Sequence, residues 1–194
     1  MPTVMNGDLI LAEATRRLGV DLRPLVAACA VWTHPSTFEA VRRVDPWGTW
    51  FPGFRRMRKG ERKGSTVDGA ILDDNTRANY AIKRAVFGTH AGVENFHCCH
   101  VWPATCYDPR HHTCIANIVL LPAAVAGLSD HDDGVAACLQ YRAWELFGWK
   151  PEEAEVPARP DGYPPAEAWL PPPEPSAKVR KALERLGTSL PMTA

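Results

Sequence analysis

Histidine and cysteine are concentrated in one short window, residues 97–114, and this cluster constrains the chain more than any other feature. The window holds four of the six cysteines and four of the seven histidines. They are Cys98, Cys99, Cys106 and Cys114, with His97, His100, His111 and His112. In a reducing compartment such a cluster favours metal binding or catalysis over disulfide bonds. We therefore expect the functional site within or beside this window.

The elements around the cluster are expected to be a strand, a loop, a second strand and a helix. Residues 96–102 are predicted as a strand that ends at Pro103, and residues 104–113 as a loop. The run 115–121 is apolar and rich in β-branched residues, which predicts the partner strand. Asp132 or Asp133 then caps a predicted helix over 135–147.

The rest of the chain is predicted to be mainly helical. Helices are expected over 8–18, 21–32, 36–43, 76–87 and 176–186, and the segment 151–175 holds nine of the 18 prolines, which favours an extended chain. The predicted fold class is α+β, mainly α, with a small ββα hairpin-helix site on a helical body. Three regions are expected within one compact unit: a helical N-terminal region over residues 1–88 with a basic loop 55–64, a ββα core 89–150, and a proline-rich acidic wrap with a terminal helix 151–194.

Three short runs in and beside the window resemble motifs of the HNH nucleases, members of the ββα-metal (His-Me finger) group. Residues 100–103 (HVWP) match a first motif of His, two apolar residues and Pro, and residues 117–121 (NIVLL) match the Asn-led second motif. Residues 106–111 (CYDPRH) are similar to the loop element of His-Cys-box homing endonucleases. The resemblance covers about 35 of the 194 residues. It implies a metal-dependent endonuclease that hydrolyses phosphodiester bonds.

The resemblance assigns roles to particular residues. His100 is the expected general base, because imidazole titrates near neutrality. Asn117 is expected either to orient that imidazole or to ligate the metal, which would be Mg²⁺ or Mn²⁺. The third motif position falls on Ala126, which cannot ligate a metal. His131 is therefore the first candidate for the metal ligand, and Asp130 is the second. Cys99 stands where HNH enzymes commonly carry an acidic ligand, and a thiolate suits Zn²⁺ better than Mg²⁺.

A structural zinc site is a second interpretation of the same cluster. Cys99, Cys106, His111 and Cys114 can supply the four ligands of a tetrahedral site that holds the loop. This set is compatible with a nuclease, and it also defines the alternative function, a non-catalytic zinc-stapled module that binds nucleic acid or protein. The zinc deaminase signature, a glycine-rich phosphate loop and a nucleophile elbow are all missing from the sequence.

A dense run of basic residues suggests how nucleic acid would be held. Six basic side chains against Glu61 leave a local charge of +5, and they are Arg55, Arg56, Arg58, Lys59, Arg62 and Lys63. Neighbouring aromatic residues suit contacts with nucleic acid. DNA is the expected partner, RNA the second candidate, and a homodimer is compatible with the sequence.

The overall composition excludes several classes of protein. With 22 basic and 22 acidic residues the chain has no net charge, which argues against a uniformly basic nucleic-acid binder. The longest weakly polar run, 114–128, is too short and too interrupted to span a bilayer. The first residues carry no pattern of a secretory signal. These observations predict a soluble, cytoplasmic protein without a membrane partner.

Overall fold

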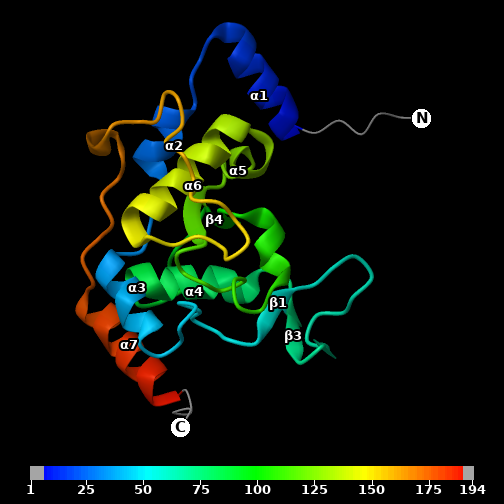
Figure 1. Cartoon of the computed structure of the whole chain (residues 1–194), viewed down its shortest axis with the longest axis vertical. Helices are drawn as coiled ribbons and strands as arrows, with labels where there is room; N and C mark the ends of the chain where they lie inside the picture. Colours follow the sequence, from blue (N-terminus) through cyan, green and yellow to red (C-terminus); the bar gives the residue numbers. More distant parts are fainter. Residues whose placement is uncertain (1–6, 190–194) are drawn as a thin grey trace.

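The computed structural model describes residues 7–189, so the first six and the last five residues of the predicted regions lie outside the described range. The architecture is α+β and mainly α, as predicted (Figure 1). The helices are α1 (Gly7–Leu18), α2 (Arg23–Cys29), α3 (Pro35–Arg42), α4 (Thr76–Phe87), α5 (Leu128–His131), α6 (Asp133–Phe147) and α7 (Ala177–Ser189), with short 3-10 turns at Pro103–Tyr107 and Ala166–Ala168. Among the described residues, no helix is long and apolar enough to cross a membrane.

The predicted hairpin forms around the His/Cys window. Strands β4 (Phe96–His100) and β5 (Ile118–Pro122) pair antiparallel, and His100 lies opposite Ile118 at the end of the ladder next to the loop. Residues 118–121 of β5 are all buried, because helices and loops cover this apolar strand. Leu120 also exchanges backbone hydrogen bonds with Val31 beyond α2, which places the hairpin in the centre of the core.

A second small sheet forms where the sequence predicted only a loop. Strands β1 (Phe54–Arg56), β2 (Thr66–Val67) and β3 (Ala70–Asp73) are ordered β1–β3–β2, with β1 parallel and β2 antiparallel to β3. Strands of two to four residues are too short to show an alternating pattern. The basic loop predicted over 55–64 is shorter at its start, because residues 54–56 form β1. In the structure it spans residues 57–65, between β1 and β2, and we use the name for this segment from here on. It projects from the body of the molecule (Figure 1).

Helix α4 begins at Thr76, directly after Asp73, Asp74 and Asn75. Asn75 adopts a left-handed conformation, with φ of 85°, and its side chain does not cap the helix. Asp73 and Asp74 serve instead, because their carboxylates accept hydrogen bonds from the backbone amides of Arg77 and Thr76. In α6, Asp132 is the cap that the sequence predicted, since its side chain accepts from the Val135 amide.

The proline-rich segment packs along the body. Trp169 is 3% exposed, and its indole N–H donates to the Pro164 carbonyl oxygen. The Leu170 amide donates to the Ala27 carbonyl oxygen, which ties the segment to α2. Helix α7 then packs on α3 and α4. One buried apolar cluster includes Phe38, Leu121 and Trp169, so all three regions of the chain contribute to the same core.

Candidate functional site

A pocket of about 310 Å³ opens beside the end of β4 and contains His100. Several elements meet there: Arg56 comes from β1, Asn75 from the start of α4, Asp130 from α5 and Asp8 from α1. The hairpin, the small sheet and three helices therefore bring together the imidazoles of His97 and His100, one guanidinium, one amide, two carboxylates and the thiols of Cys98 and Cys99. This grouping is the candidate site, which we call the His100 pocket.

The tautomer of His100 follows from its hydrogen bond. Its Nε2 lies 2.9 Å from the carbonyl oxygen of His112, and a carbonyl only accepts, so Nε2 must carry the proton. In the neutral ring, Nδ1 is then the atom with the free electron pair. The side chain is 5% exposed, and burial, with the neighbouring His112 and Arg56, lowers the pKa of His100 to about 3. His100 is accordingly a neutral base at physiological pH.

His112 and Asp73 support His100 from the core side. The His112 and His100 rings are nearly parallel, with centroids 5.3 Å apart, and His112 Nε2 lies 3.1 Å from a carboxylate oxygen of Asp73. Burial alone would raise the pKa of Asp73, but hydrogen bonds from His112 and from the Arg77 amide lower it below its usual value. Sequence reasoning missed this pair, since 39 residues separate its members.

Asn117 holds the loop of the hairpin together. It is fully buried, its side-chain oxygen accepts from the Trp102 amide, and its side-chain nitrogen donates to the Thr105 hydroxyl and the His111 carbonyl oxygen. All three contacts are within the protein, so the side chain of Asn117 is engaged in holding the loop. It fixes the segment between the strands, including residue 112, whose carbonyl orients His100.

The four residues of the predicted zinc site do not converge. Among residues 7–189, no group of three or more His, Cys, Asp or Glu side chains is placed to hold a metal ion. The Cys99 thiol contacts the Ala126 carbonyl oxygen, and His111 packs edge-on against Trp47 and Trp149.

The thiols of the cluster are also poor metal ligands in this environment. Burial raises the pKa of Cys99 to about 11 and that of Cys114 to about 12, and it raises the pKa of Cys106 as well. These thiols stay protonated near neutrality, whereas metals bind the thiolate. The set therefore behaves as packing residues in the structure.

Two carboxylates line the His100 pocket, those of Asp130 and Asp8. Asp130 lines the pocket, whereas its neighbour His131, the first choice, is not one of the lining residues. Asp8 approaches from α1, and a side chain at Gly127 would collide with its carboxylate. No sequence motif pointed to Asp8, because it lies some 90 residues before His100 along the chain.

The basic run divides into structural and exposed members. Arg55 is 5% exposed and makes a bidentate ion pair with Glu61, at 2.7 and 2.8 Å, so its guanidinium is engaged within the protein. Glu61 also accepts from the Arg58 amide. Lys63 pairs with Asp74 at 2.7 Å. Arg58, Lys59 and Arg62 are exposed on the basic loop, and Arg56 lines the His100 pocket.

Comparisons of the chain with protein-family models, with curated proteins and with solved structures found no match.

Proposed function

We propose that this protein is a metal-dependent, HNH-like endonuclease that hydrolyses phosphodiester bonds in DNA, with His100 as the general base. The observation that carries the proposal is the hydrogen bond from His100 Nε2 to the His112 carbonyl, at 2.9 Å, which leaves Nδ1 as the basic atom of a residue that lines a pocket. Arg56 at the same pocket supplies a positive charge. A base beside a fixed cation is the arrangement that hydrolysis of a phosphodiester requires.

His100 acts in this proposal by taking a proton from the attacking water. A base with a pKa near 3 is always unprotonated at neutral pH but has a weak pull on that proton. An anionic phosphate in the pocket raises the pKa of His100 towards neutrality, because it stabilises the imidazolium form. Substrate binding thus strengthens the base at the moment when it is needed. The Arg56 guanidinium offsets the negative charge that develops on the phosphate.

The carboxylates of the pocket fit a hard divalent ion. Mg²⁺ is commonly held by one or two carboxylates together with water and substrate phosphate, so it does not need three protein ligands. Asp130 and Asp8 provide such oxygen donors beside His100. The bound ion would neutralise charge on the leaving oxygen. This donor set suits Mg²⁺ or Mn²⁺ and offers no thiolate to zinc.

Chelation distinguishes this catalytic ion from the zinc staple that the sequence suggested. We expect EDTA to abolish cleavage of supercoiled plasmid, and added Mg²⁺ or Mn²⁺ to restore it, while the melting temperature stays the same. The measurement is a gel assay beside a thermal melt of the same samples. A melting temperature that drops on chelation, with about one zinc per chain by elemental analysis, would support the zinc-stapled alternative.

Matched carboxylate variants test where the ion is held. Asp130→Asn should lose most of the cleavage, whereas Asp133→Asn, three residues later in an exposed position of α6, should retain it. Equal activity of the two variants would contradict the placement at Asp130.

The exposed residues of the basic loop are expected to hold phosphates. Replacing Arg58, Lys59 and Arg62 with Ala should flatten the dependence of log affinity for duplex DNA on log salt by about one unit per lost contact, and by about three at most. The measurement is fluorescence anisotropy over a salt series. A control that removes the same charge from α7, by replacing Lys178, Arg180 and Lys181 with Ala, should keep the parent slope. If both triple variants had the same slope of log affinity against log salt, the basic loop would be a solvated surface that does not contact DNA.

A further inference from the structure

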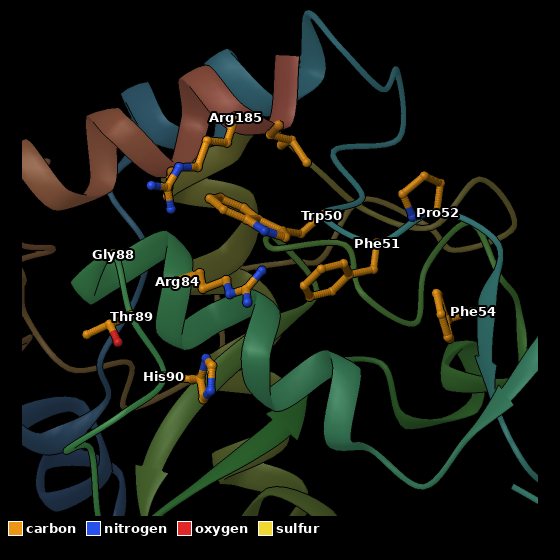
Figure 2. Close-up of a pocket in the computed structure, with 11 residues that line it drawn as sticks. Trp50, Phe51, Pro52, Phe54, Arg84, Gly88, Thr89, His90 and Arg185 are labelled. Carbon is orange, nitrogen blue, oxygen red and sulfur yellow. The ribbon is translucent and has the colours of Figure 1, made fainter. Parts of the chain in front are cut away.

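A second pocket, of about 580 Å³, lies between the segment 50–54, helix α4 and helix α7. Its volume falls in the range of about 300 to 1,000 Å³ that is typical of small-molecule sites. Figure 2 shows Arg84 rising from α4 and Arg185 descending from α7, with the indole of Trp50 between them and Phe51 beside Arg84. We call this site the aromatic pocket.

Aromatic rings and guanidinium groups are layered at this pocket. The Arg84 guanidinium carbon lies 5.5 Å from the centre of the Phe51 ring, and that of Arg77 lies 5.5 Å from Phe51 and 4.9 Å from Phe54. Phe51 and Phe54 are half-buried, so their rings remain partly accessible. Flat surfaces of this kind accept another flat group by stacking.

The charge of the pocket indicates an anionic ligand. Two arginines contribute to its lining, and no carboxylate is present among its described lining residues. Thr89 and His90 add polar groups at one end, and the His90 ring stacks on Tyr80 with centroids 4.3 Å apart. A ligand that carries both a negative charge and a flat apolar ring matches this combination. A simple inorganic anion would leave the aromatic surface unused.

We propose that the aromatic pocket binds one nucleotide of a single-stranded segment of nucleic acid, with the base stacked on the Phe51–Arg84 layer and the phosphate on the guanidinium groups. Bases in a duplex are stacked on each other and present no free face, whereas an unpaired base does. Guanidinium is the side-chain group that best matches phosphate oxygens. This inference adds a substrate preference to the proposed nuclease function. It rests on that function, because it takes the bound strand to be the substrate of the nuclease.

Strand β1 connects the aromatic pocket to the His100 pocket. Phe54 lines the first and Arg56 the second, and both point away from the buried Arg55 side of the strand. Residues two apart along a strand are separated by about 6.6 Å. A stacked single strand covers this distance in about two nucleotides. One strand of nucleic acid can therefore reach both pockets.

The test compares three fluorescein-labelled ligands by anisotropy in EDTA, so that no cleavage occurs. They are a thymidine 12-mer, an abasic 12-mer with the same number of phosphates, and a duplex of the same length. The parent should bind the thymidine 12-mer about 5- to 150-fold more tightly than the abasic 12-mer, because stacking contributes about 1–3 kcal/mol per base.

Two variants locate the effect at the pocket. Phe51→Leu should erase the preference for bases over abasic sites, and Arg84→Gln should weaken both 12-mers and reduce the single-strand salt slope by about 0.7. The matched controls are Phe96→Leu in β4 and Arg180→Gln in α7, neither of which lines the aromatic pocket. Both controls should bind as the parent does, and circular dichroism should give all five proteins the same spectrum.

The outcomes separate this inference from the nuclease proposal. Equal affinity of the parent for thymidine and abasic 12-mers, or a full preference retained in folded Phe51→Leu, would overturn the inference and leave the nuclease standing. A parent that shows the ring-dependent preference but never cleaves DNA would uphold binding at the pocket and overturn the nuclease.

Discussion

Replacing His100 with Gln is expected to lower the rate of plasmid cleavage by about 100- to 10,000-fold, the contribution of a general base. Gln is the sharper choice than Ala, because its side-chain amide can still donate to the His112 carbonyl oxygen that His100 contacts. It has no atom that can take a proton from water at neutral pH. The fold should therefore survive while the chemistry is lost, and the measurement is single-turnover cleavage at saturating protein.

The control for this variant is His34→Gln. His34 accepts a hydrogen bond from the Ser36 amide at the start of α3, where Gln can do the same, and it is absent from the lining of the His100 pocket. His34→Gln should cleave at the parent rate. Parent-like cleavage by a folded His100→Gln protein would remove His100 from the mechanism, whereas a collapsed melting temperature would call for His100→Asn as a second variant.

Replacing Asn117 with Ala is expected to lower the free energy of unfolding by about 3 kcal/mol. The substitution leaves the partly buried Trp102 amide without its acceptor and removes two further hydrogen bonds, and each buried group without a partner costs about 1–3 kcal/mol. In a domain of this size the melting temperature should fall by about 6–12 °C. Urea unfolding followed by circular dichroism measures the change.

Asn79→Ala provides the matched control for Asn117. The side-chain oxygen of Asn79 in α4 is buried without a hydrogen-bond partner, so its removal should cost little, and Ala favours the helix. If Asn117→Ala were as stable as Asn79→Ala, the loop would not depend on the hydrogen bonds of Asn117. Cleavage by Asn117→Ala should also decrease, because the same loop positions the carbonyl that orients His100.

The sequence was sufficient to predict the elements whose residues are neighbours along the chain. The hairpin, the long helices and the packed proline-rich segment all follow from local patterns of apolar residues, caps and prolines. The small β1–β3–β2 sheet was missed because its pairing joins segments that are each too short to carry a pattern. The Asp73–His112 pair was missed for a related reason: tertiary packing, and no spacing along the chain, brings it together.

The cysteines show a different limit of sequence reasoning. Counting them directs attention to the region of the candidate site but does not reveal their surroundings: Cys99 and Cys114 are buried and their pKa values are raised to about 11 and about 12. A sequence shows only that a residue is cysteine. Whether its side chain is a buried, protonated thiol or a thiolate that can bind a metal depends on its surroundings in the fold. The sequence likewise could not show which of the adjacent residues Asp130 and His131 lines the His100 pocket, whereas the structure places Asp130 there.

The ion pair between Arg55 and Glu61 affects the entropy that the basic loop would lose on binding an anion. Glu61 repels phosphate through its own charge, yet it holds the base of the loop in one conformation through Arg55 and the Arg58 amide. A flexible loop would lose conformational entropy on binding, and that loss would subtract from the affinity. Here the ordering takes place when the chain folds. In the binding of DNA that we propose, the single acid in the basic run would thus help its neighbours to hold a negatively charged partner.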